Sequence, residues 1–159
     1  MHAEPPSRLR LQGAIHHLAL RGQEGQALFH GAADYQALDT IIGQLLQDAG
    51  ARVHAYCWMT NHLHLAVEMA PELIVAFQDE LAGRYSLYRQ HGPEAVGSVF
   101  APPDPPFRVD ADAYLLQLIR YIHLNPLRAG VVRDAADYRW SGHRAYLGYA
   151  GPPWLSTDL

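Results

Sequence analysis

The sequence predicts an α+β domain: a ferredoxin-like antiparallel sheet with helices packed on one face. The main observation is the order of its elements, which reads strand, helix, strand, strand, helix and a final short strand. The strands at 52–60 and 62–69 are separated by so short a link that an antiparallel hairpin is favoured. Because 159 residues are about the length of one domain, we expect a single domain over 1–159.

Residue patterns in the first half of the chain predict a strand followed by a helix. A first strand is predicted from Gly13 in GAIHHLALRG, and it ends where the glycines of RGQEGQ indicate a turn. Residues 34–50 place apolar side chains three and four positions apart, as in an amphipathic helix. We expect Asp34 to be the N-cap of this helix and Gly50 to end it.

The second half is more irregular. A helix is predicted from 72 to 92, and residues 93–109 are expected to form a loop with at most a short strand, because four prolines fall within five positions. A third helix is predicted over 110–125, with Asp110 as its cap and Pro126 as its stop. The segment YRWSGHRAYLG could add a short helix.

The composition argues against several classes of protein. The N-terminus has no signal-peptide core and no window is apolar enough for a membrane span, so we expect a cytoplasmic protein without membrane contact. We expect 1–10 to be a flexible arm and 150–159 a C-terminal tail. The net charge of −4 argues against a general DNA-coating protein. All 12 basic residues are arginine, however, which suits a local groove for phosphates.

The segment WMTNHLHLAVE holds two histidines two positions apart. Side chains alternate across a strand, so His62 and His64 must share one face while Leu63 and Leu65 point to the other. Two imidazoles on one face could bind a metal ion, although a solvent-facing pair without metal is the commoner arrangement.

The same alternation bears on the preceding strand. If it continues unbroken from 56 to 64, Tyr56 and Trp58 share the face of His62. A bulge at Thr60 or Asn61 would reverse that assignment.

The third predicted helix adds a second pair of polar side chains. Tyr121 and Asn125 lie four positions apart in RYIHLNP, so they share a helix face if the last turn persists next to Pro126. Two imidazoles and an amide oxygen suit Mg²⁺ or Mn²⁺ better than a closed zinc site. From the residues alone, Tyr121 could equally be a core residue with a satisfied hydroxyl.

Four segments carry a family resemblance: GAIHHLALRG, VHAYCWMTNHLHL, RYIHLNPLRAGVV and YRWSGHRAYLG. In order and spacing they resemble the blocks of the single-tyrosine HUH transposases, whose motif is histidine, hydrophobic residue, histidine. More narrowly, they are similar to the REP-associated tyrosine transposases and their insertion-sequence relatives. The resemblance runs from about residue 8 to residue 157.

The resemblance implies a role for each polar residue. His62 and His64 would bind a divalent metal, Mg²⁺ or Mn²⁺, with Asn125 in the place of a third polar ligand. Tyr121 would be the nucleophile that nicks single-stranded DNA and transfers the strand through a covalent 5′-phosphotyrosine. The implied partner is single-stranded or hairpin DNA, and a homodimer is left open.

DNA would lie across the open sheet face. Bases could stack there on Tyr56 and Trp58, while arginines meet the phosphates. The candidate DNA-binding arginines are Arg21, Arg120, Arg128 and Arg144.

The chain also departs from the pattern. Where relatives carry a basic and aromatic stretch of the kind GHLFQGRYK, this sequence has VGSVFAPPDPPFR, which removes phosphate contacts. A catalytically retired or domesticated protein that binds DNA structure is therefore one alternative. Another is a zinc metallohydrolase with a water nucleophile, in which Tyr121 is dispensable. Tyr85 and Tyr88 are the alternative tyrosine nucleophiles.

Overall fold

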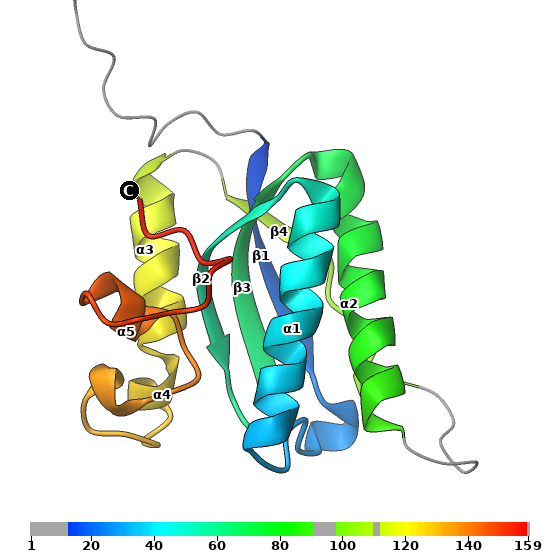
Figure 1. Cartoon of the computed structure of the whole chain (residues 1–159), viewed down its shortest axis with the longest axis horizontal. Helices are drawn as coiled ribbons and strands as arrows, with labels where there is room; N and C mark the ends of the chain where they lie inside the picture. Colours follow the sequence, from blue (N-terminus) through cyan, green and yellow to red (C-terminus); the bar gives the residue numbers. More distant parts are fainter. Residues whose placement is uncertain (1–12, 91–97, 110–111, 159) are drawn as a thin grey trace, which may run out of the picture.

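A computed structural model describes residues 13–90, 98–109 and 112–158. Its four strands form one antiparallel sheet in the order β2-β3-β1-β4 (Figure 1). The strands are β1 (Ala14–Arg21), β2 (Arg52–Trp58), β3 (His62–Met69) and β4 (Phe107–Val109). The longer helices are α1 (Ala32–Ala49), α2 (Ile74–Arg89) and α3 (Asp112–His123). Short helices lie at η1 (Gln23–Gly25), η2 (Pro71–Leu73), α4 (Asn125–Arg128), η3 (Ala135–Asp137) and α5 (His143–Tyr146).

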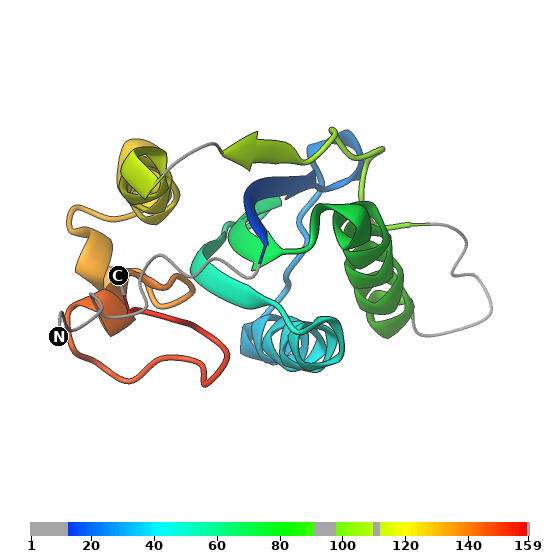
Figure 2. The ribbon, with the colours of Figure 1, turned by 90° about the horizontal axis from the view of Figure 1, so that it is seen from above.

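The predicted α+β fold with an antiparallel sheet is confirmed, including the β2–β3 hairpin. Helices α1 and α2 pack side by side on one face of the sheet (Figure 2). The apolar positions of the strands and helices meet there in the main core, which buries side chains such as Leu38, Ile42, Leu63, Leu65 and Leu81. This burial supplies most of the driving force for folding.

The other face of the sheet is only partly open. Helix α3 lies across β2 and β3 on this side, where Leu115, Ile119 and Ile122 pack against Cys57 and Ala66. We expected this face to be free for DNA. Since α3 covers one half, the accessible half is the part over β1 and β4 (Figure 2).

Two predicted helix boundaries differ from the structure. Helix α1 begins at Ala32 rather than at Asp34, whose carboxylate instead accepts the backbone N–H of His30 at 2.8 Å. Helix α3 ends at His123, two positions earlier than predicted, and the chain enters a new helical turn at Asn125. Pro126 lies in the first turn of α4, where a missing N–H leaves no hydrogen bond unmade. Gly50 ends α1 as predicted, with a left-handed φ of 62°. The expected cap Asp110 and the arm at 1–10 lie outside the described residues.

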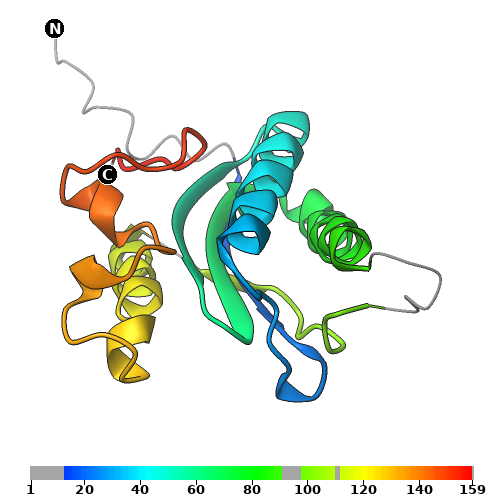
Figure 3. The same ribbon diagram turned by 60° about the horizontal axis from the view of Figure 1, so that its bottom comes forward.

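The C-terminal segment follows the free edge of β2 (Figure 3). The backbone N–H of Ser156 donates to the Val53 carbonyl at 2.8 Å, and Trp154 lies against Gly43 of α1. Trp154, Leu155 and Ser156 of this segment are thus packed against the domain. Among the residues that the structure describes, no helix has the length and apolar character needed to span a bilayer.

Asp34 ties α1 to α2. Its carboxylate accepts hydrogen bonds from Tyr88 at 2.8 Å and from Arg89 at 2.6 Å. Burial raises the pKa of Asp34, but the hydrogen bonds from His30, Tyr88 and Arg89 outweigh that effect and hold the pKa below its usual value.

Replacing this carboxylate should destabilise the fold. We expect Asp34→Asn to lower the free energy of unfolding in urea by about 1–3 kcal/mol at pH 7, because a charged acceptor of three donors is lost. A lowered pKa means that the wild-type advantage is full above the ordinary carboxyl pKa and is lost as the pH falls through the folded-state value, so the difference should narrow in acid. Glu80→Gln, which breaks the exposed Glu80–Arg84 pair, is the control and should cost under about 0.5 kcal/mol. Equal losses in both variants would contradict this role.

Candidate active site

The two histidines of the predicted motif lie on β3, a central strand, and face the same side. Their ring centroids are 5.1 Å apart and the rings are nearly perpendicular, at 86°. The Nδ1 atom of His62 lies 2.7 Å from Oδ1 of Asn61, so this nitrogen carries the proton and donates it. This hydrogen bond orients the His62 ring.

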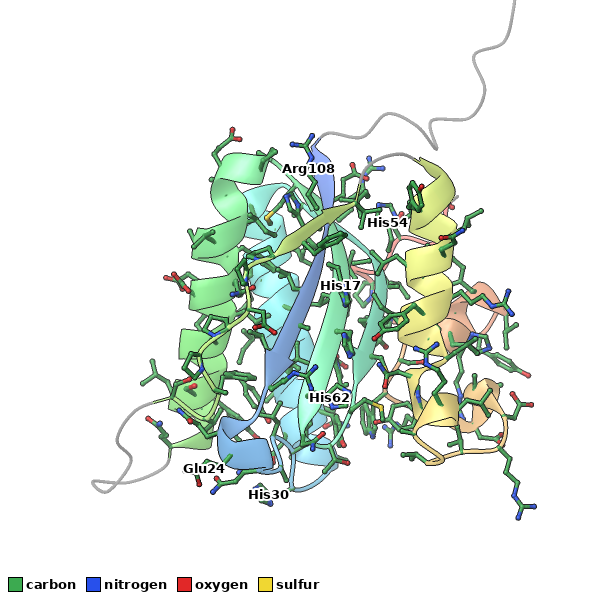
Figure 4. All side chains as sticks on the ribbon, turned by 180° about the vertical axis from the view of Figure 1, so that it is seen from behind. His17, Glu24, His30, His54, His62 and Arg108 are labelled. Carbon is green, nitrogen blue, oxygen red and sulfur yellow. The ribbon has the colours of Figure 1, made fainter. Side chains whose placement is uncertain are left out.

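A third histidine completes the cluster. His17 on β1 lies beside His64, with its Nε2 atom 3.0 Å from Nδ1 of His64 and the two rings stacked at 5.2 Å. Figure 4 shows His17 and His62 on the same side of the sheet. His17 is absent from the predicted set, because the sequence holds His16 and His17 in succession. Alternation sends one to each face, and Leu18 and Leu20, which share the face of His16, are the signal that places His17 away from the main core. The pairing of β1 with β3 then brings His17 beside His64.

Tyr121 reaches this cluster from α3. Its ring centroid lies 6.1 Å from that of His64 and 6.0 Å from that of His17, with both contacts close to edge-on. The side chain is 48% exposed, so a substrate can approach it. From α4, Arg128 places its guanidinium 4.3 Å above the Tyr121 ring and donates to the Tyr121 backbone carbonyl. The turn at Pro126 therefore folds an arginine back over the tyrosine.

Asn125 stands at the first position of α4, and its side chain hydrogen-bonds with that of His62. The structure thus brings Tyr121, Asn125 and the histidine pair into one cluster. The alternative tyrosines lie elsewhere, on α2: Tyr85 is buried and donates to the Leu28 carbonyl at 2.5 Å, and Tyr88 donates to Asp34.

The cluster lowers the pKa of its histidines. Burial is the main cause at His64, assisted by His17, His62 and nearby arginines including Arg21, and it lowers the pKa to about 3. Burial also lowers the pKa of His62, although the hydrogen bond with Asn125 opposes the shift, and burial lowers the pKa of His17. All three rings are therefore neutral near pH 7, which is the form that binds metal ions.

The donor set fits an open cation site. Within the described ranges, no group of three or more His, Cys, Asp or Glu side chains is arranged to hold a metal ion. The available donors are two neutral imidazoles and the amide oxygen of Asn125, while His17 is engaged with His64. Such a set leaves coordination positions for water or phosphate oxygens, as Mg²⁺ and Mn²⁺ require, and does not form a closed zinc site.

The predicted DNA-binding arginines divide into two groups. Arg21 pairs across from His62, Arg128 covers Tyr121, and Arg120 is exposed one position before Tyr121. Arg144 lies elsewhere: its Nε donates to the Ala136 carbonyl at 2.6 Å, and the side chain lines a separate groove of about 630 Å³ between α1 and the C-terminal segment.

The predicted face of Tyr56 and Trp58 is wrong. Tyr56 stands opposite Leu65 and Trp58 opposite Leu63, so both share the leucine face and are buried in the main core. The turn at 59–61 breaks the alternation, as a bulge there would. Neither ring can stack on DNA bases from this position.

Trp58 should therefore act on stability and not on DNA binding. Its indole Nε1 donates to Oδ1 of Asp39 at 2.8 Å, and burial raises the pKa of that carboxyl. We expect Trp58→Phe to lower the free energy of unfolding by about 1–3 kcal/mol, because Asp39 loses its donor. Oligonucleotide affinity of the folded protein, measured by fluorescence anisotropy well below the unfolding temperature, should stay unchanged. A loss of affinity at unchanged stability would restore Trp58 as a DNA contact.

Comparison with known proteins gives a fold relationship. No family model matches this sequence, and no curated protein matches it. A solved structure of a REP-associated tyrosine transposase bound to a REP hairpin is similar, with a TM-score of 0.72 and 15% identity over 98% of this chain and 92% of that one. A candidate transposase from Deinococcus radiodurans is also found, with a TM-score of 0.47 and 19% identity over 77% of this chain and 95% of that one. This chain has the fold of a REP-associated tyrosine transposase.

Proposed function

We propose that this protein is a transposase that nicks single-stranded DNA and transfers the strand through a covalent 5′-phosphotyrosine at Tyr121. One observation carries the proposal: a half-exposed tyrosine from α3 meets a neutral histidine pair from the sheet. The shared fold with a tyrosine transposase supports it, as does that protein's binding of a REP hairpin.

The chemistry assigns work to each residue. His62, His64 and Asn125 would hold Mg²⁺ or Mn²⁺, which supplies positive charge to offset the charge of the reacting phosphate. The Tyr121 oxygen bonds to phosphorus while the bond from phosphorus to the 3′-oxygen breaks. The phenolic proton passes to solvent, and the leaving 3′-oxygen takes up a proton. Because the phosphotyrosine is itself a phosphodiester, a 3′-hydroxyl can attack it, release Tyr121 and re-form the DNA linkage without ATP.

The positive charges around the tyrosine suit a phosphate backbone. Arg21 stands opposite His62 on the neighbouring strand, Arg128 covers the Tyr121 ring, and Arg120 is exposed one position before Tyr121. Arginine binds phosphate oxygens with two parallel donors, so these side chains would hold the strand although the whole chain carries a net charge of −4.

A covalent adduct is the direct test. With Mn²⁺ and labelled hairpin oligonucleotides that carry single-stranded flanks, we expect a protein–DNA band that survives a denaturing gel. Tyr121→Phe should abolish the band, whereas Tyr149→Phe, at an exposed tyrosine outside the cluster, should preserve it. Binding without any adduct would favour a retired DNA-binding protein. Cleavage that survives Tyr121→Phe would favour a water nucleophile.

His17 should control metal affinity through His64. If His64 binds the cation through Nε2, its Nδ1 must carry the proton and donate it to Nε2 of His17. We expect His17→Leu to weaken Mn²⁺ binding by about 10–100-fold in calorimetry, and His17→Gln, whose amide oxygen can accept the same proton, to restore most of it.

His16→Leu is the matched control, because this neighbouring histidine lies on the opposite face of β1. It should leave Mn²⁺ affinity unchanged. The expected role of His17 is wrong if His17→Gln binds Mn²⁺ as weakly as His17→Leu.

A further inference from the structure

We propose that the groove between β4 and α3 binds an unpaired nucleobase of the DNA strand, next to Tyr121. The inference rests on the proposed function and assigns part of its substrate to a place. The groove measures about 680 Å³. Its walls include Phe107 and Val109 from β4, Tyr114, Gln117 and Tyr121 from α3, and His17 from β1.

The fold builds both walls from regular elements. Phe107 pairs with His17 and Val109 with Ile15, so these β4 side chains share the face of the histidine cluster. On α3, Tyr114, Gln117 and Tyr121 lie three and four positions apart and therefore form one line along the helix. That line leads directly to the proposed nucleophile.

The aromatic side chains of this groove are exposed to an unusual degree. Phe107 is 68% exposed and Tyr114 is 58% exposed, although both are large and largely apolar. Tyr56 and Trp58, the aromatics predicted to stack on bases, are buried instead. Exposed aromatic rings around a hollow are typical of interaction sites, and a flat ring suits the π-face of any base.

The polar groups of the lining favour a base over a phosphate. Gln117 offers an amide that can both donate and accept, as base edges require. Arg108 pairs with His16, so its side chain takes the other face of β4, and no carboxylate lines the groove among the residues that the structure describes. The separate groove that holds Arg144 differs, because Arg139 and the carboxylate of Asp39 also line it.

The location selects which nucleotide would bind. Tyr121 and His17 belong both to this groove and to the histidine cluster. A strand whose scissile phosphate lies at the Tyr121 hydroxyl would thus place an adjacent base in the groove. Holding that base would align the phosphate for attack, because a positioned substrate reacts far faster than a loosely bound one.

The test distinguishes contacts with bases from contacts with phosphates. In a Tyr121→Phe background, which prevents adduct formation, affinity is measured for an oligo-dT of about 15 nucleotides and for an abasic strand of equal length. We expect Tyr114→Ala to weaken oligo-dT binding on the order of 10-fold and to leave abasic binding unchanged. The salt dependence of oligo-dT binding should keep its slope, because no phosphate contact is removed.

Matched variants control for losses of binding that arise from general destabilisation of the fold. Tyr114→Phe keeps the ring and should bind like the parent. Tyr149→Ala removes a comparably exposed tyrosine, 66% exposed, from outside the groove and should also bind like the parent. Phe107→Leu keeps apolar bulk on β4 but loses the π-face, so it should weaken oligo-dT binding alone.

Several outcomes would overturn the assignment. One is an equal loss of affinity for oligo-dT and for the abasic strand. Another is unchanged oligo-dT affinity in both Tyr114→Ala and Phe107→Leu. A third is a dimer, seen by sedimentation, that Tyr114→Ala dissociates while oligo-dT binding persists. Adduct formation by the parent with an intact Tyr121 is scored separately. If adducts form but the groove variants bind oligo-dT normally, only the groove assignment fails. A base-dependent loss without any adduct would refute the nicking chemistry and leave the groove in place.

Discussion

The antiparallel register of β1 against β3 is the constraint on which the site depends. It places Arg21 opposite His62, and it brings His17 within hydrogen-bond distance of His64. A shift of one residue would send His17 into the main core and bring His16 to the cluster. The register is held by Leu18, Leu20, Leu63 and Leu65, which fill the core on the opposite face. The apolar packing under α1 and α2 therefore also sets the polar geometry above it.

The position of α3 is the second determinant. Because it packs over β2 and β3, its exposed edge faces the uncovered half of the sheet, where Tyr121 meets the histidines. The chain then reverses through α4, so that Asn125 contacts His62 and Arg128 covers the tyrosine ring. Helix α3 and the short α4 thus carry three groups to a single place, and the groove beside β4 is the space that α3 leaves open.

Local sequence patterns were sufficient for part of this arrangement. The period of two in a strand places His62 and His64 on one face whatever the neighbours are, and the spacing of apolar residues indicates α1 and its end at Gly50. Features that depend on tertiary pairing were not predictable in the same way. His17 required the strand register, and the face of Tyr56 and Trp58 depended on how the turn at 59–61 breaks the alternation. Pro126 was predicted to stop the third helix, but a proline is also well suited to the first turn of the next one.

The C-terminal segment has a consequence for how copies of the chain can associate. Backbone groups of Val53, Tyr56 and Trp58, on the outer side of β2, already bond to Ser156, Gly142 and Trp140. At the opposite border, β4 has three residues and follows a run rich in proline, which cannot extend a ladder of hydrogen bonds. The β2 border is thereby covered, and the short β4 border offers little backbone for strand addition. Self-association of this domain would have to use side-chain surfaces, and a continuous sheet between two copies is disfavoured.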